Sequence, residues 1–341
     1  MIIDIHGHYT TAPAPHQAFR DAQLARLADP SRPVPRTERI SDDALRESVE
    51  HNQLKILRER GGDLMLFSPK ASGMEHHITD PATARDWARA SNDLVHRVTE
   101  LYPRHFAPVC QLPQTPGGGV ADAVAELHRC VTESGFVGCN LNPDPSGGHW
   151  TAPPLTDPTW YPLYEALCEL DVPAMVHVSS ACNPVFHTLG AHYLNADTTA
   201  FMQLLQGGAE LFARFPGLRF VIPHGGGAVP YHWGRYRGLA VRMGLPDPAG
   251  LLGNVVFDTC VYHRPGIDLL TRVIGTEHVL FASEMLGAVR GVAPETGTAW
   301  DDTKTYVDAA GLTPDQLHQV YEANARRVYP RLDARLRSQG R

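Results

Sequence analysis

Short apolar runs alternate with helical patterns along the whole chain, and this alternation constrains the fold more than any other feature. Runs such as 174–176 and 220–222 are continuously apolar, as expected for strands covered on both faces. Eight strands are predicted, at residues 2–6, 63–68, 106–112, 137–142, 173–178, 219–224, 254–259 and 278–283. Helical patterns fall between or after them, at residues 42–60, 81–102, 120–133, 161–170, 196–215, 229–243, 266–274 and 314–327. Eight β-then-α units favour a closed (β/α)8 TIM barrel over an open doubly wound sheet.

The length of 341 residues suits one barrel domain over residues 1–341, and 43% hydrophobic residues provide an ample core. Residues 9–39 are rich in proline and charge and too long for an ordinary βα loop. This early segment is predicted to be a lid or a subunit-contact arm, inserted into the barrel domain.

The charge pattern excludes several classes of partner. The net charge is −7 without any basic block, so we expect no binding to nucleic acid or to an anionic membrane. No apolar run approaches the roughly 20 residues that span a bilayer, and no signal region is evident, so a cytoplasmic location is expected. The six cysteines form no C-x-x-C pair, which favours reduced thiols over disulfides or a thiolate metal site.

Histidines and one carboxylate stand where three predicted strands end. His6 and His8 are two residues apart on the first strand, so both imidazoles can face the same point. His177 ends the fifth strand and Glu284 follows the eighth, at the same end of a parallel barrel. Imidazole and carboxylate ligands suit zinc, and we assign His6, His8, His177 and Glu284 as ligands with room left for a water. The alternative is that each histidine is a hydrogen-bonded core or surface residue.

His224 opens the string HGGG, where the sixth strand gives way to a helix. The glycines could leave backbone N–H groups facing an anion or an oxyanion, and the histidine could move a proton. Lipases share the string, but they also need a G-x-S-x-G elbow, which this chain lacks. The alternative is a tight turn beneath a packed helix.

Cations and hydrogen-bond donors at the same end are candidates for substrate binding. Lys70 follows the second strand and Arg290 lies after the eighth, and either could hold a substrate carboxylate or be a solvated surface residue. Arg235 is a weaker third candidate. Tyr193 and Asn195 follow His177 and could donate hydrogen bonds, although Asn195 could instead cap a helix beginning near residue 196.

Taken together, the H-x-H pair, His177, the His224 string and an acidic residue closing the eighth strand resemble the metal-dependent amidohydrolase superfamily. The resemblance covers nearly the whole chain and implies the same (β/α)8 barrel. Most members carry aspartate where Glu284 stands. Many also bind two metals bridged by a carbamylated lysine after the fourth strand. Asn140 and Asn142 occupy that region, so the resemblance implies one divalent metal, for which we expect Zn²⁺.

Three longer strings, at residues 139–145, 222–235 and 281–285, resemble the branch of decarboxylases and hydratases that act on aromatic or ring-cleaved acids. This narrower resemblance implies reversible addition of water to the C=C bond of 4-oxalomesaconate, a polycarboxylate of the protocatechuate and gallate routes. It implies Glu284 as base and metal neighbour, His224 as partner or proton donor for the enolate, and a homodimer. The alternatives are a metal-dependent non-oxidative decarboxylase and a non-catalytic metal-binding scaffold. Ligand type alone does not separate zinc from manganese or iron.

Overall fold

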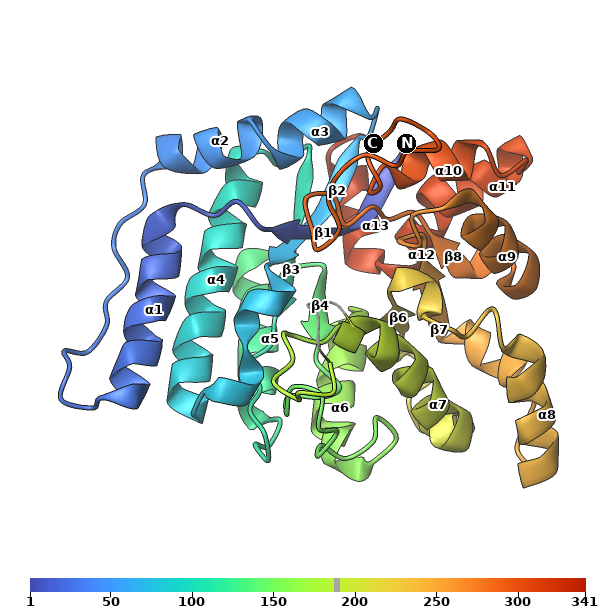
Figure 1. The fold of residues 1–341 in the computed structure, drawn as a ribbon, viewed down its shortest axis with the longest axis horizontal. Helices are drawn as coiled ribbons and strands as arrows, with labels where there is room; N and C mark the ends of the chain where they lie inside the picture. Colours follow the sequence, from blue (N-terminus) through green and yellow to red (C-terminus); the bar gives the residue numbers. More distant parts are fainter. Residues whose placement is uncertain (187–190) are drawn as a thin grey trace.

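The computed structural model describes residues 1–186 and 191–341, and its centre is a sheet of eight strands (Figure 1). The strands are β1 (Ile3–Tyr9), β2 (Leu64–Pro69), β3 (Phe106–Gln111), β4 (Gly138–Leu141), β5 (Ala174–Val176), β6 (Phe220–Ile222), β7 (Val255–Asp258) and β8 (Val279–Leu280). They pair in sequence order, each parallel to the next. Beyond β8 the chain returns to β1, because Ile5 N–H donates to the Phe281 carbonyl at 3.0 Å and Glu284 N–H donates to the His6 carbonyl at 2.9 Å. The predicted TIM barrel is confirmed.

Helices occur at every predicted helical range, and three further helices, at Ala14–Ala28, Thr303–Asp308 and Pro330–Ser338, were not predicted. The helices are α1 (Ala14–Ala28), α2 (Asp42–Glu50), α3 (Gln53–Glu59), α4 (Pro81–Leu101), α5 (Ala121–Ser134), α6 (Tyr161–Glu169), α7 (Ala191–Arg214), α8 (Trp233–Met243), α9 (Arg264–Ile274), α10 (Thr303–Asp308), α11 (Pro314–His318), α12 (Asn324–Val328) and α13 (Pro330–Ser338). Among these helices none combines the length and apolar character that crossing a bilayer requires.

Several predicted helix boundaries were wrong. The pattern at 42–60 forms two helices, because the chain turns at His51 and Asn52. The pattern at 229–243 becomes an α-helix only at Trp233, after a run of turns. The pattern at 314–327 begins with a capping box at Thr313 and is interrupted by a π-helical turn over Gln319–Ala323.

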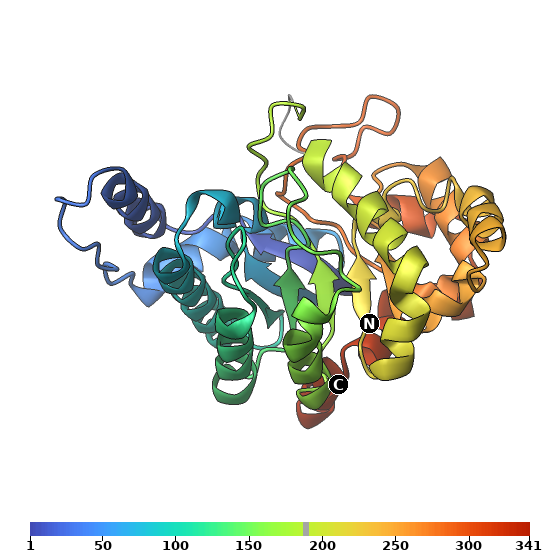
Figure 2. The same cartoon turned by 90° about the horizontal axis from the view of Figure 1, so that it is seen from below.

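Two layers of apolar side chains hold the barrel. The interior layer draws on every strand or its entry: Ile3, Ile5, Leu64, Leu66, Ala107, Val109, Val137, Met175, Val221, Val256 and Leu280. Tyr329, Leu332 and Leu336, from α13 and its start, pack against the same layer. A second layer, between strands and helices, includes Phe67, Phe106 and Phe257. The termini lie together at the end of the barrel opposite the long loops (Figure 2). Those loops therefore share the other end with the carboxyl ends of the strands.

The early segment, residues 9–39, lies mostly outside the barrel mouth. Its helix α1 packs beside α4, where Phe19 joins Met74 and Trp87 in a small buried cluster (Figure 1). Of residues 9–39, Thr10 alone lines the cavity described below. Both expectations for this segment, a lid over that cavity or a contact with a second subunit, stay predictions.

Candidate metal centre and active site

Three histidines bring their Nε2 atoms together inside the barrel mouth. His6 Nε2 lies 3.1 Å from His8 Nε2, and His8 Nε2 lies 3.3 Å from His177 Nε2. All three side chains are buried. The pairing of β1 with β2 shifts register between Asp4 and Gly7, so Ile5 reaches the interior layer and His6 still faces the barrel mouth.

Hydrogen bonds at the Nδ1 atoms explain this convergence. The Nδ1 partners are Asp258 Oδ2 for His6, Ser68 Oγ for His8 and the Val178 carbonyl for His177, each at 2.8 Å. A carboxylate and a carbonyl can only accept, so His6 and His177 carry their protons on Nδ1 and direct Nε2 lone pairs at the common point. Such partners orient metal-ligating imidazoles in proteins.

The spacing of these nitrogen atoms fits a metal ion. Lone pairs facing one another at 3.1 and 3.3 Å repel unless a cation lies between them. Tetrahedral zinc with Zn–N bonds of about 2.0–2.1 Å places its nitrogen ligands roughly 3.3 Å apart. These two Nε2–Nε2 distances therefore match the spacing of nitrogen ligands on one zinc ion.

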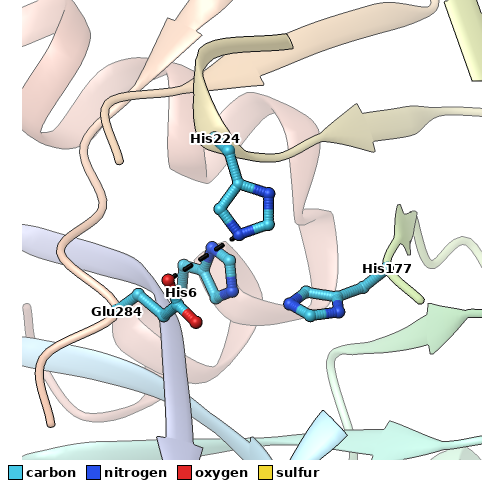
Figure 3. A group of neighbouring side chains, drawn as sticks. All are labelled: His6, His177, His224 and Glu284. Atoms are coloured by element: carbon cyan, nitrogen blue, oxygen red, sulfur yellow. Dashed lines mark ion pairs between the residues drawn. The ribbon is translucent and has the colours of Figure 1, made fainter. Parts of the chain in front are cut away.

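Glu284 supplies a carboxylate at the same point. It follows β8 in a left-handed backbone conformation (φ 48°), and the N–H bond to His6 ties it to β1. Tyr262 Oη donates to Glu284 Oε2 at 3.1 Å. Ligand atoms of His6, His177, His224 and Glu284 all lie within 4.8 Å of one another, and Figure 3 shows these side chains converging from four strand ends. The histidine cluster therefore includes one carboxylate, that of Glu284.

His224 is held from two sides by the beginning of α7. Its Nδ1 lies 2.8 Å from Asp197 Oδ2, and the Tyr193 ring lies against the imidazole with centroids 4.5 Å apart. Tyr193 and Asp197 are four residues apart and therefore share one helix face. His224 Nε2 faces Glu284 Oε2 at 3.7 Å and has no hydrogen-bond partner among the described residues (Figure 3). This nitrogen is free to exchange a proton within the site.

The glycines after His224 make a turn and not an anion cradle. Gly225, Gly226 and Gly227 all have positive φ, and a Cβ on Gly226 would lie 2.4 Å from the Phe257 ring. Their N–H groups already donate to Asp258 Oδ1, the Pro223 carbonyl and the His224 carbonyl. The expectation that these amides bind an anion is therefore wrong, and the tight turn explains the string.

Burial and neighbouring charges set the protonation states. Burial and the neighbouring imidazoles lower the pKa of His8 to about 3 and hold the pKa of His177 well below its usual value, so both rings are neutral. Burial opposes ionisation of Glu284, but His224 outweighs it and lowers the pKa of the carboxyl. Burial likewise opposes charging of His224, yet Asp197 and Glu284 raise its pKa well above the usual value. An anionic acceptor thus faces a cationic donor.

Another buried group, His6 with Asp258 and Cys260, also has ligand atoms within 4.8 Å of one another. Burial and the charge of Asp258 raise the pKa of the Cys260 thiol well above its usual value, so the sulfur stays protonated. A thiol of that kind is a poor metal ligand. The histidine and glutamate group is therefore the better metal centre.

A cavity of about 490 Å³ opens beside the histidines. Side chains that could contact a bound molecule line it: His8, Thr10, Lys70, Ser72, His177, Ser179, Ser180, His192, Tyr193, Glu284 and Arg290. Lys70 and Arg290 are exposed, and neither has a carboxylate within 4.0 Å in residues 1–186 and 191–341. The Arg290 guanidinium donates to the Leu286 carbonyl at 2.6 Å. Two cations are therefore available at the mouth for an anionic ligand.

Two of the predicted substrate contacts lie elsewhere. Asn195 is exposed and does not line the cavity. It does not cap a helix either, because α7 already begins at Ala191. Arg235 is also exposed and absent from the lining.

Sequence reasoning missed Asp197 and Tyr262, which contact His224 and Glu284. The i, i+4 spacing of Tyr193 and Asp197 on a helix facing the sixth strand was the signal that could have indicated Asp197. Tyr262 lies in an irregular loop, where spacing gives no comparable signal.

Comparison with known proteins now places the chain. A model described as amidohydrolase matches residues 3–331. The chain belongs to the amidohydrolase family. The resemblance inferred from the H-x-H pair and the strand-end residues is confirmed.

Two similar proteins match this amidohydrolase over its full length. It is 57% identical over 341 residues to 2-keto-4-carboxy-3-hexenedioate hydratase from Sphingobium sp., covering 100% of this chain and 99% of the relative. The crystal structure of 4-oxalomesaconate hydratase from Rhodopseudomonas palustris superposes with a TM-score of 0.92 at 56% identity, covering 100% of this chain and 99% of that one.

Decarboxylases are more distant. A dihydroxybenzoic acid decarboxylase from Polaromonas sp., solved with bound manganese, superposes with a TM-score of 0.69 at 19% identity, covering 96% of each chain. At that identity the likeness establishes the fold. That structure holds manganese, and this amidohydrolase has a cluster of three histidines and a glutamate whose ligand atoms lie close enough together to hold a metal ion.

Proposed function

We propose that the protein is a metal-dependent hydratase that adds water reversibly to the C=C bond of 4-oxalomesaconate (2-keto-4-carboxy-3-hexenedioate), giving 4-carboxy-4-hydroxy-2-oxoadipate. The observation that carries this proposal is the full-length similarity to two hydratases at 57% and 56% identity. The site geometry supports it, because a carboxylate and an imidazole face each other at one cavity beside three converging histidines.

The metal is proposed to be Zn²⁺, held by His6, His8, His177 and Glu284. The Nε2 spacing and the neutral state of the imidazoles support this ligand set. A bound divalent cation supplies Lewis acidity and lowers the pKa of water at the site toward neutrality. His224 is assigned to proton transfer and not to the metal, because its Nε2 atom faces Glu284 and lies in hydrogen-bond contact with none of the other three histidines.

Glu284 and His224 divide the proton transfers. Glu284 takes a proton from water, and the resulting hydroxide bonds to C4, the carbon β to the ketone. The π-electron pair of the C3=C4 bond moves toward the ketone and forms an enolate. His224 Nε2–H then gives its proton to C3, so one water has been added across the bond. The proton on Glu284 returns to His224 across the 3.7 Å gap and restores both groups.

The cations at the mouth would hold the substrate's carboxylates. Lys70 and Arg290 line the cavity without carboxylate partners in the described structure, and Tyr193 offers a hydroxyl beside His224. A substrate with three carboxylates explains why cations face the cavity of a protein with net charge −7. A homodimer and a cytoplasmic location stay predictions.

The test is incubation of the metal-loaded protein with 4-oxalomesaconate while absorbance and CO2 are followed together. Hydration removes the conjugated chromophore without releasing CO2. Release of CO2 would favour a decarboxylase, and an unchanged substrate would favour a metal-binding scaffold. Chelation should abolish the absorbance change, and added Zn²⁺ should restore it.

A further inference from the structure

The loop after β2 carries the cavity's lysine and is held from outside the barrel. Residues 70–78 contain two short 3-10 helices, η1 (Ala71–Met74) and η2 (His76–Ile78). Lys70, Ala71 and Ser72 line the cavity. Gly73 N–H donates to the Lys70 carbonyl at 3.0 Å, and Gly73 is close enough to the lysine stem that a Cβ there would lie 3.6 Å from Lys70 Cδ. The backbone at Gly73 therefore helps to fix the backbone position of Lys70 and the direction of its side chain.

Arg20 of α1 grips this loop from the side away from the cavity. Its side chain is fully buried, which is unusual for a cation. Arg20 Nη2 donates to the Met74 carbonyl at 2.9 Å and Nε contacts Glu75 Oε2 at 3.2 Å. The guanidinium also lies 5.2 Å from the centre of the Trp87 ring. Trp87 Nε1–H in turn donates to the Gly73 carbonyl at 3.0 Å.

The backbone conformation of Glu75 depends on these contacts of Arg20. Glu75 joins η1 to η2 in the left-handed region (φ 48°), where residues other than glycine are strained and persist only if their surroundings hold them. Next to it, His76 is buried and bonded to Asn142 Nδ2 and the Leu112 carbonyl. The loop is thus fixed by His76 to Leu112 and Asn142, which follow β3 and β4, and by Arg20 to α1.

We propose that Arg20 is a positioning residue that sets the location of Lys70 and so the affinity for polycarboxylates. The early segment then serves the site by bracing its lysine loop from behind. This inference rests on the proposed role of Lys70 in substrate binding. Without Arg20 the Met74 carbonyl and Glu75 lose their partner, the strained junction relaxes, and the Lys70 ammonium moves relative to Arg290.

The test measures binding apart from turnover, using propane-1,2,3-tricarboxylate as a non-reacting probe of the metal-loaded full-length protein. Its dissociation constant is determined by calorimetry for wild type, Arg20→Met, Lys70→Ala and the double variant. Loss of Lys70 should weaken binding at least about tenfold, the range for hydrogen bonds to charged groups. Arg20→Met should weaken it about three- to tenfold, as expected for a residue acting through others. Glu75→Gln, a milder change at the same contact, should weaken it in the same direction.

The double variant separates positioning from general destabilisation. If Arg20 acts through Lys70, Arg20→Met should add almost nothing in the Lys70→Ala background. Arg97→Met is the matched control, because Arg97 bonds Ile40 and Asp42, just beyond the early segment, and within the described residues has no hydrogen bond or ion pair to residues 70–78. It should leave probe binding unchanged.

The outcomes distinguish the two proposals. Normal binding by Lys70→Ala would overturn the assigned role of Lys70 and with it this inference. Weakened binding by Lys70→Ala with normal binding by both Arg20→Met and Glu75→Gln would overturn the positioning role alone. Additive losses in the double variant, or an equal loss in Arg97→Met, would show a structural effect and would also overturn it.

Discussion

Asp258 is the residue whose replacement tests the metal centre most directly. Its Oδ2 accepts from His6 Nδ1–H at 2.8 Å, while Oδ1 accepts from the N–H groups of Gly225 and Cys260 at 3.1 and 3.0 Å. In Asp258→Asn the remaining oxygen can serve either the two backbone N–H groups or the imidazole. Leaving two buried N–H groups unpaired costs about 1–3 kcal/mol each, so the oxygen stays with the backbone. The amide NH2 then faces His6 Nδ1.

Two donors cannot bond each other, so His6 must move its proton to Nε2. That proton occupies the position from which the ring would bind the metal. Loss of such an orienting partner lowers metal affinity about 10- to 100-fold, equivalent to roughly 1.4–2.7 kcal/mol. The fold should remain, since both backbone hydrogen bonds are kept.

The assay is a titration of metal-free protein with Zn²⁺ in competition with a chromophoric chelator. Glu126→Gln is the matched control, since Glu126 is a buried carboxyl bonded to Asn92 and Arg129 on the outer helices. Its zinc affinity should equal that of wild type. An Asp258→Asn protein that is folded and binds Zn²⁺ as tightly as wild type would refute the assignment of His6 as an oriented ligand.

Other changes have equally specific outcomes. Glu284→Gln should lower kcat at least about 100-fold, the scale of lost general base catalysis; near-normal turnover with metal still bound, checked by elemental analysis, would count against the base role. Asp197→Asn should lower kcat about 10- to 100-fold by disturbing His224 while the zinc content stays normal, and a protein that loses zinc instead would make His224 a ligand. Burial lowers the pKa of His76 from 6.5 to about 4. Between these two pH values the unfolded chain therefore binds more protons at His76 than the folded chain does. The free energy of unfolding should fall as the pH drops through this window, by up to about 3 kcal/mol. Urea unfolding at pH 7 and pH 5 should therefore differ less for His76→Gln than for wild type; equal differences would contradict this origin.

The sequence was sufficient to predict the barrel, because buried parallel strands such as β5 and β6 read as short apolar runs that alternate with helical patterns. The ends of the strands were equally predictable: the Nε2 atom of His8 lies close to those of His6 and His177, and His6, His177, His224 and Glu284 form one cluster, while the set of metal ligands stays a prediction. Helix boundaries were less predictable because tertiary packing decides them. The helix α7 begins at Ala191, five residues before the predicted start, and this shift moved Asn195 from a cap to an exposed helix face.

Contacts between distant segments were beyond sequence reasoning. Asp197 bonds His224 across 27 residues, and Arg20 reaches Glu75 across 55. The i, i+4 spacing of Tyr193 and Asp197 indicates a shared helix face but not the partner His224, and the pairing of Arg20 with Glu75 leaves no periodic signal. Each contact depends on how a helix sits against a loop. The HGGG string was ambiguous for a related reason. A tight turn and an anion-binding site have the same sequence, and only the hydrogen-bond partners of the glycine N–H groups distinguish the two.

The barrel closes between β1 and the segment after β8, and this closure determines when during synthesis the metal site can be completed. His6 and Glu284 come from distant parts of the chain and are joined there by a hydrogen bond from Glu284 N–H to the His6 carbonyl, beside a second one from Ser283 N–H to Asp4 Oδ1. During synthesis on the ribosome the amino-terminal histidines emerge long before their acidic partner exists. With the proposed ligand set, metal binding at full affinity requires release of nearly the whole polypeptide, so metal uptake would report that a newly made molecule has finished folding.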